Sequence, residues 1–360
     1  MVDQLPPERP VKPVLSSASV LLRLAGIGAV VVAIASTFFY VNGTLDAQRL
    51  RPKTLVNALE HNNGVHPGYR RNHAKGMCVI GYFESTGNAQ SLSSAQVFQT
   101  GRTPVVGRFA LPSANPYAPD SSVPIRSLAL RFTEANGQQW RTGMNSMPVF
   151  PVGTPEAFYA MLQAGAPDPA TGKPKPDAMP AFFAAHPEAG PFLQWVKTAK
   201  PSASFATETY NGINAFYLVN AAGQRQAVRW GVAPEGQDAP GASAPNEADY
   251  LEKDLAQRLS VGPLKWQFNL TLAEAGDPVN DASKPWPAER KVVNAGTLVL
   301  QRAEPQNNGE CRDINYDPLI LPSGIEGSAD PLLAARSAAY ASSYLRRTSE
   351  VDPLSQEKRP

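Results

Sequence analysis

The sequence predicts a domain of the α+β class, an antiparallel β-barrel with surrounding helices, preceded by one N-terminal transmembrane helix. Three observations lead to this prediction. Short apolar runs with irregular spacing and turn residues between them fill the first half of the chain, as in barrels and sandwiches. Three later segments have helical patterns. Near the amino terminus, 18 consecutive residues carry no charge.

Length and composition limit the possible classes of protein. The 360 residues suffice for one large domain or two average ones, and 42% are hydrophobic, so a sizeable core is expected. The formal net charge is +2, from 33 basic and 31 acidic residues. Nucleic-acid partners are not expected, because they require a clear excess of cations. The 35 prolines and 27 glycines predict long irregular connections.

The uncharged N-terminal run extends from Leu24 to Val41. As a helix it is about 27 Å long, close to the thickness of the hydrocarbon core. We expect a disordered polar tail over residues 1–19 and a transmembrane anchor over 20–41. The small-residue sequence Ala33-Ile34-Ala35 leaves a cleaved signal segment as the alternative. Basic residues are balanced on the two sides, so the positive-inside rule does not decide the orientation.

The segments expected to be strands are short and rich in β-branched and aromatic residues, and turn residues such as Asn136-Gly137 separate them. A hairpin is expected around Ala222-Gly223. The expected strands are Met77–Phe83, Thr103–Phe109, Ile125–Phe132, Gln139–Met144, Phe216–Asn220, Ala227–Val232, Trp266–Leu272 and Gly296–Arg302.

The expected helices begin with recognisable capping residues. Thr154 is placed to cap a helix over Pro155–Gln163, and Asp330 to cap one that ends at Arg347. A third helix is expected over Ala248–Leu259. Exposed loops are expected at 165–180 and 233–245, and a C-terminal tail at 348–360.

Individual polar residues carry little functional signal by themselves. Cys78 and Cys311 are too few for a tetrahedral zinc site, and the sequence leaves open whether they are free thiols or one disulfide. The four histidines form no zinc-protease pair. Neither a glycine-rich phosphate loop nor a nucleophile elbow is apparent.

Several short sequences, in order, carry more information than any single residue. The first is Arg70-Arg71-Asn72-His73-Ala74-Lys75-Gly76, and the later ones are residues 81–84, 103–109, 143–150, 296–300, 316–318, 324–326 and 336–340. Over residues 55–347 this set resembles the haem catalases. The chain is too short for the C-terminal extensions of ordinary catalases. It is therefore similar to the minimal catalase-related peroxidases, and we expect a catalase-like haem domain over residues 42–347.

The resemblance implies haem b, with Tyr340 as the axial ligand of its iron, because tyrosinate ligation is typical of catalases. Arg336 lies one helical turn earlier, and its charge favours the phenolate form. His73 would transfer the peroxide proton and Asn145 would orient the peroxide. Without the resemblance, we would interpret Tyr340 as an exposed tyrosine, His73 as a core histidine and Asn145 as a turn residue.

The resemblance also implies contacts around the rest of the haem. Arg70, Arg108 and Arg347 would bind the two propionates, because guanidinium groups pair with carboxylates in bidentate fashion. Phe150 and Phe158 would pack against the porphyrin. The alternatives are surface salt bridges for the arginines and an ordinary core position for the phenylalanines.

Three positions depart from the pattern of the relatives. Ala110 replaces a serine that contacts the distal histidine, Pro124 replaces a channel aspartate, and Tyr344 replaces a histidine one turn after Tyr340. His73 then needs another partner to set its tautomer. These changes favour peroxidase turnover over fast disproportionation of peroxide.

We therefore expect a haem-dependent, catalase-like peroxidase that reduces hydrogen peroxide. A second peroxide, or an unidentified small organic or protein electron donor, would return the haem to its resting state. The N-terminal helix would bind the membrane, and the haem domain would be periplasmic or otherwise exported. Two alternatives stay open, namely rearrangement of fatty-acid hydroperoxides and a membrane-tethered haem-binding module without enzymatic activity.

Overall fold

The structure, a computed structural model, describes residues 16–41, 50–236 and 247–350, and the chain divides into two units, residues 1–50 and 51–360. Most of each predicted tail, at 1–19 and at 348–360, lies outside the described residues, as does most of the loop predicted at 233–245. Each unit is described by itself.

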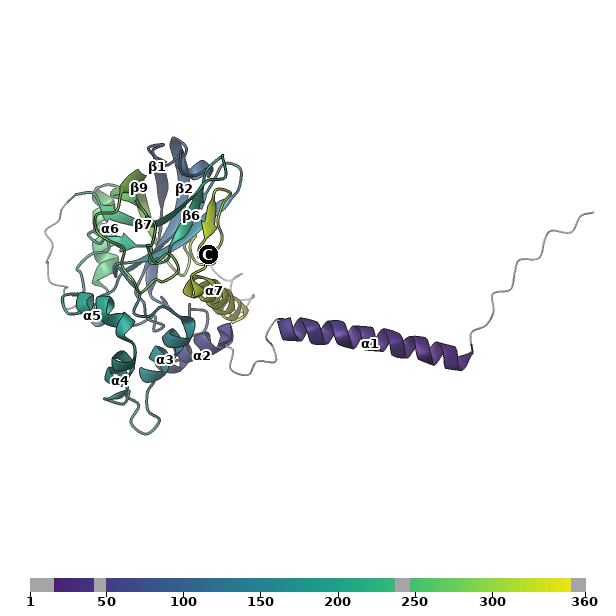
Figure 1. The fold of residues 1–360 in the computed structure, drawn as a ribbon. Helices are drawn as coiled ribbons and strands as arrows, with labels where there is room; N and C mark the ends of the chain where they lie inside the picture. The colour runs from purple at the N-terminus through teal and green to yellow at the C-terminus, as the bar shows by residue number, and fades with distance from the viewer. Residues whose placement is uncertain (1–15, 42–49, 237–246, 351–360) are drawn as a thin grey trace, which may run out of the picture. The chain divides into compact units, whose positions relative to one another are not determined.

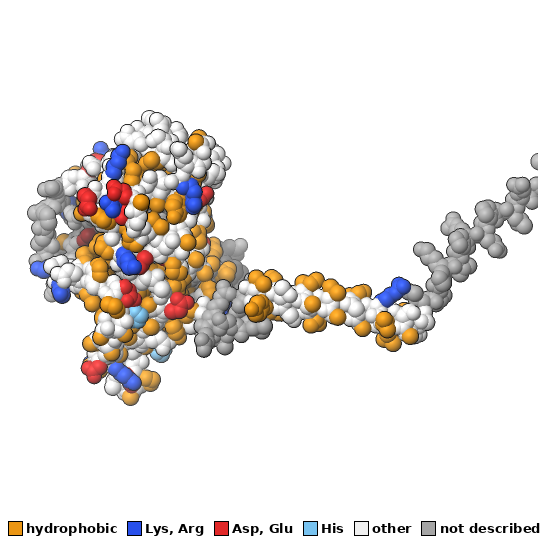
Figure 2. Space-filling view, in the orientation of Figure 1, with side chains coloured by type: hydrophobic (Ala, Val, Ile, Leu, Met, Phe, Trp, Pro, Cys, Tyr) orange, Lys and Arg blue, Asp and Glu red, His pale blue; other side chains and the backbone are white. Residues whose placement is uncertain are grey.

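The described part of the first unit is chiefly one helix, α1 (Ser17–Val41). An 18-residue stretch of it has a mean hydropathy of 2.2, and the helix has no buried side chain. Hydrophobic side chains run along its length in Figure 2. Its 25 residues extend about 37 Å, enough to cross a hydrocarbon core. The helix begins before Arg23 and is longer than the uncharged run that predicted it. By length and composition it suits either an anchor or a signal sequence.

The second unit is built on a closed antiparallel β-barrel, which confirms the predicted fold (Figure 1). Around the ring the neighbours are β7, β5, β4, β3, β2, β1, β9 and β8, and pairing of β8 with β7 closes it. The bounds are β1 (Gly76–Ser85), β2 (Gly101–Ala110), β3 (Ser127–Thr133), β4 (Gln139–Asn145), β5 (Tyr210–Asn211), β7 (Arg225–Pro234), β8 (Leu264–Leu272) and β9 (Val292–Pro305). Outside the ring, β6 (Phe216–Val219) pairs with β7, and β10 (Ile325–Gly327) pairs with β6.

Aromatic side chains fill the interior of the barrel. Phe132 and Trp140 are register partners on β3 and β4, and their rings stack with centroids 4.6 Å apart. Phe83 and Phe268 reach the same cluster from β1 and β8, and all four residues are fully buried. Since alternate residues of each strand point inward, the barrel is a packed core with no space for a large ligand.

Helices gather at one end of the barrel and beside it (Figure 1). They are α2 (Pro52–Asn63), α3 (Pro155–Ala164), α4 (Ala178–Ala185), α5 (Gly190–Val196), α6 (Tyr250–Val261) and α7 (Pro331–Ser349), with short 3₁₀ turns η1 (Gln96–Phe98), η2 (Asp120–Ser122) and η3 (Pro187–Ala189). The predicted caps are confirmed, because Thr154 accepts a hydrogen bond from Ala157 N and Asp330 accepts one from Leu332 N. α2, α3 and α7 contact one another.

Some elements differ from the prediction. The sequence analysis missed α2, α5, β5 and β10, and α4 begins at Ala178 inside the segment predicted to be a loop. α2, α4 and α5 have incomplete hydrophobic patterns because they bury few side chains. β5 and β10 are only two and three residues long, and pairing with longer neighbouring strands stabilises them.

A disulfide joins Cys78 of β1 to Cys311, which decides between the two states that the sequence left open. The Cα atoms are 5.3 Å apart, and both residues are fully buried. The bridge closes a loop across a sequence separation of 233 residues. It holds the irregular segment at 309–314 against the strand that follows His73.

We predict that the double substitution Cys78→Ser/Cys311→Ser lowers the free energy of unfolding by about 2–5 kcal/mol, because the open chain gains conformational entropy when it unfolds. Urea denaturation followed by circular dichroism measures this change. Wild-type protein unfolded with and without a thiol reductant is the control, and the reductant should reproduce the loss. Coinciding unfolding curves for the wild type and the variant would contradict a stabilising bridge.

Candidate functional site

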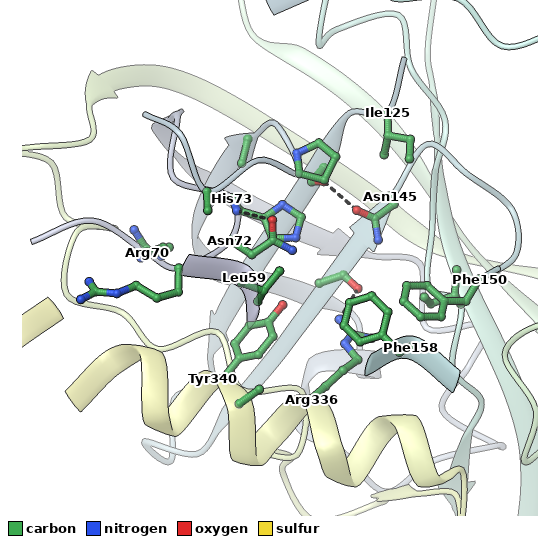
Figure 3. Close-up of a pocket in the computed structure, with 18 of the residues that line it drawn as sticks. Leu59, Arg70, Asn72, His73, Ile125, Asn145, Phe150, Phe158, Arg336 and Tyr340 are labelled. Carbon is green, nitrogen blue, oxygen red and sulfur yellow. Dashed lines mark hydrogen bonds between the residues drawn. The ribbon is translucent and has the colours of Figure 1, made fainter. Parts of the chain in front are cut away.

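One cavity of about 650 Å³ lies among the barrel and helices α2, α3, α5 and α7. All the site residues predicted from the sequence line it, although they come from segments far apart in the chain. They are Arg70 and His73 before β1, Arg108 on β2, Asn145 at the end of β4, Phe150, Phe158 on α3, and Arg336, Tyr340 and Arg347 on α7. In Figure 3, His73 and Asn145 lie on one side of the cavity, and Tyr340 and Arg336 project toward it from α7 on the other.

His73 lies in the turn before β1. Its φ of 56° is left-handed, which is uncommon for a residue other than glycine and often marks a functional site. The backbone N–H of His73 donates to Asn72 Oδ1 at 2.9 Å. This bond supports a tight turn, and the turn directs the imidazole toward the cavity.

The His73 imidazole is held in its neutral form. The side chain borders the cavity, yet protein atoms surround it closely. Burial, as the largest cause, and the charges of Arg108, Arg336 and Arg70 together lower its pKa to about 3. Nδ1 is buried and has no hydrogen-bond partner among the described residues. Ala110, where relatives carry a serine hydroxyl, is buried and lines the same cavity. A neutral imidazole can accept a proton.

Asn145 lies at the end of β4, directly opposite Ser127 on β3. The Ser127 hydroxyl donates to Asn145 Oδ1 at 2.6 Å. Ser127 is buried and also lines the cavity, but the sequence analysis did not identify it. Only the strand register brings the two side chains together, and no local pattern signals that register.

Arg336 and Tyr340 share one face of α7, as their spacing predicts. The Arg336 guanidinium carbon lies 5.9 Å from the centre of the Tyr340 ring. Arg336 donates to Asn214 Oδ1 and to Gly143 O, and Asn214 in turn donates to Asp330 Oδ2 at 2.8 Å. The helix cap and the Arg336 side chain are thus linked through Asn214, a buried residue that sequence reasoning missed.

Gly143 leaves room for the Tyr340 hydroxyl. A Cβ atom at this position would lie 3.2 Å from Arg336 Nη2 and 3.5 Å from Tyr340 Oη. Gly143 and Tyr340 both line the cavity, so the glycine lets the tyrosine hydroxyl approach β4 closely. A larger residue at position 143 would press against both groups.

Three arginines lie together at another part of the cavity wall, and neutral oxygens are their main partners. Arg70 donates to the carbonyl oxygens of residues 311, 312 and 314 at 2.9, 3.1 and 3.0 Å. Arg347 donates to the carbonyl of residue 312 at 2.7 Å, and Arg108 to the carbonyl of residue 74 at 3.1 Å. Burial lowers the pKa of each arginine, that of Arg108 to about 10.

Little negative charge opposes this cluster. Asp313 lies 3.5 Å from Arg347, and none of the described residues that line the cavity is Asp or Glu. Arg108 Nε is also buried, and no described residue hydrogen-bonds to it. Buried charges are normally paired, so this end of the cavity suits a ligand with carboxylate groups.

The remaining walls are apolar. Phe150 and Phe158 lie with ring centroids 5.3 Å apart, on the side of Figure 3 opposite Arg70. Ala110, Pro124 and Tyr344, the three predicted departures, also line the cavity. The volume is in the range of small-molecule and cofactor sites. Apolar walls, a tyrosine hydroxyl and partly uncompensated arginines together fit a flat macrocycle with two carboxylates and a central metal.

A closed antiparallel barrel with a cofactor-sized cavity beside it defines the structural class, and comparison with known sequences identifies the family. A family model described as Catalase matches residues 44–352, so the chain belongs to the catalase family. It is 38% identical to the catalase-related peroxidase of Synechococcus elongatus, over 88% of this chain and 93% of the relative. The catalase-related peroxidase of Mycolicibacterium paratuberculosis is 29% identical over 83% and 95% of the two chains.

Solved structures agree on the fold. A bacterial catalase superimposes with a TM-score of 0.70 at 24% identity, over 81% of this chain and 60% of that chain. A fungal catalase gives a TM-score of 0.69 at 21% identity, over 81% and 62%. The rat catalase is 28% identical over 76% of this chain but only 55% of its own length. The matched region thus spans about half of that larger catalase.

Proposed function

We propose that this protein is a membrane-anchored haem b peroxidase that reduces hydrogen peroxide with electrons from an organic donor, and that it disproportionates peroxide only slowly. One observation carries the proposal: residues from five separate segments line a single cavity with the polar and apolar groups that a haem site needs. As a member of the catalase family, the chain is an oxidoreductase that acts on peroxide and uses haem.

Tyr340 is the proposed ligand of the haem iron, because its hydroxyl faces the cavity from α7. A bound haem would supply redox chemistry at its iron, and the residue that holds the iron would tune its reactivity. Arg336, held by Asn214 and Gly143, places a positive charge beside the ring of Tyr340. Arg70, Arg108 and Arg347 would bind the propionates.

His73 and Asn145 are the proposed groups that act on the peroxide. A neutral imidazole at His73 can take a proton from one peroxide oxygen and return it to the other. The Asn145 amide can hydrogen-bond the peroxide without adding charge. Phe150 and Phe158 contribute apolar surface for the macrocycle and exclude water from its edge.

Two departures support slow disproportionation. With Ala110 in place of a hydroxyl, Nδ1 of His73 has no partner among the described residues, so the tautomer and tilt of the imidazole are weakly specified. Pro124 adds no negative charge to the cavity wall. Among the described residues that line the cavity there is no carboxylate that could orient peroxide as it enters. An organic donor is therefore the better source of the returning electrons.

The chain organisation we propose is an anchor over residues 20–41 and a haem domain over 42–347, exported to a periplasmic or similar compartment. α1 is long and apolar enough to span a bilayer. The buried disulfide supports an oxidising compartment for the haem domain, since structural disulfides are rare where thiols are kept reduced.

The first prediction concerns iron ligation. Tyr340→Phe should lose haem or lack the absorption features of tyrosinate ligation, because it removes the oxygen that would bind iron. Tyr344→Phe lies one turn further on α7 and is the matched control, with haem content close to wild type. Absorption spectra of the purified proteins measure both. A Tyr340→Phe protein with full haem and an unchanged spectrum would show that another residue binds the iron.

The second prediction concerns proton transfer. His73→Ala should keep its haem and react with hydrogen peroxide about 10²–10⁴-fold more slowly, because a positioned base is lost. In the wild type a pKa near 3 keeps His73 neutral, so this rate should stay level from about pH 8 down to about pH 5. Protonation should slow the reaction only at lower pH, whereas an ordinary histidine would titrate near 6.5.

Stopped-flow mixing followed at the main haem absorption band measures these rates. His186→Ala is the control, because His186 pairs with Glu188 and is not among the cavity-lining residues. Equal rates for the wild type and His73→Ala would contradict the role assigned to His73. A wild-type midpoint near pH 6.5 would instead contradict the lowered pKa of this histidine.

The third prediction concerns the anchor. The full-length protein should be recovered in the membrane fraction, and a chain that begins at Asp46 should be soluble and keep its haem. Fractionation with N-terminal sequencing tests both. A soluble mature protein that begins at Ser36 would instead identify 20–41 as a cleaved signal.

A further inference from the structure

A row of directly paired residues crosses three strands at the edge of the cavity. Ala110 on β2 is opposite Ser127 on β3, and Ser127 is opposite Asn145 on β4. We propose that Ser127 is a positioning residue, whose hydroxyl holds the Asn145 amide so that its N–H groups face the peroxide site. The inference rests on the proposed haem function and adds a residue to it.

The contact itself carries the first step of the argument. The Ser127 hydroxyl donates to Asn145 Oδ1 at 2.6 Å, and Ser127 is 6% exposed. A primary amide has one acceptor oxygen and two N–H donors. Because Oδ1 of Asn145 accepts the hydrogen bond from Ser127, Nδ2 is free to donate into the cavity. In Figure 3 this nitrogen lies on the side that faces Phe158 and Tyr340.

The second step is the freedom that the amide would otherwise have. The terminal torsion of asparagine is broad and nearly two-fold, so the amide can turn over at little cost. Turned over, Asn145 would present an acceptor to the cavity in place of donors. The backbone of Asn145 is held independently, because Asn211 donates to the carbonyls of Asn145 and Ser146 at 3.4 and 3.3 Å. Ser127 therefore specifies the orientation of the side chain.

The third step is the contrast with His73. Ala110 carries no hydroxyl, and the buried Nδ1 of His73 has no partner among the residues that the structure describes. The hydroxyl is instead one strand away, on Ser127, where it contacts Asn145. Hydrogen bonding thus orients the asparagine of the pair and not the histidine. Loss of Ser127 should then affect ligand binding through Asn145 alone.

Fluoride binding to the ferric haem protein tests this inference without relying on turnover. An iron-bound fluoride accepts hydrogen bonds, so it reports on the donors that face the cavity. Ser127→Ala should raise the fluoride Kd by about 3- to 10-fold, the effect of one hydrogen bond. Ser127→Thr keeps a hydroxyl and should restore an affinity close to wild type. Ser93→Ala is the control, because this fully buried serine bonds Gly324 O away from the cavity.

A double-mutant cycle separates positioning from general packing. In the Asn145→Ala background, Ser127→Ala should change the fluoride Kd no further, because the amide it orients is gone. The rate of reaction with hydrogen peroxide should follow the same pattern. Two results would overturn this inference and leave the proposed function standing. One is an equal loss of fluoride affinity in the wild-type and Asn145→Ala backgrounds, and the other is an unchanged fluoride Kd in Ser127→Ala with an intact haem band. A wild type without haem would overturn the proposed function and this inference with it.

Discussion

The site depends on one electrostatic constraint, the burial of arginine side chains around a single cavity with little negative charge to match them. Arg70, Arg108 and Arg347 bind mainly backbone carbonyl oxygens, and burial lowers the pKa of all three. Such cations are costly to bury, so the fold must supply a dense set of fixed dipoles around them. A ligand with carboxylate groups would relieve this cost, and its binding should stabilise the domain.

The elements that hold the arginines also connect the two sides of the cavity. The segment at 311–314 supplies carbonyls to Arg70 and Arg347, and the disulfide attaches this segment to β1 just after His73. α7 carries Arg347 together with Arg336 and Tyr340. Together, α7, the segment at 311–314 and β1 set the separation between Tyr340, the residue proposed to bind iron, and His73, which is proposed to act on peroxide. The aromatic core of the barrel keeps this frame rigid.

The two sides differ in how firmly their polar groups are oriented. Arg336 is held through Asn214 by Asp330, a residue that also caps α7. On the other side Asn145 has a fixed partner, Ser127. His73 has a strained backbone conformation, and its Nδ1 has no partner in the described part of the chain. This asymmetry gives a physical basis for expecting firm haem binding and loosely specified proton transfer, and it is consistent with a peroxidase that disproportionates peroxide slowly.

The sequence by itself determined the strands of the barrel other than β5, the capped helices at Thr154 and Asp330 and the helical spacing of Arg336 and Tyr340, because these depend on residues close in the chain. The short motifs, taken in their order along the chain, also resembled those of the catalase family. The disulfide, α2 and the contacts of Ser127 and Asn214 were decided only by the tertiary structure. Strand register and barrel closure join residues that are many positions apart, and no local pattern encodes a hydrogen bond across that distance.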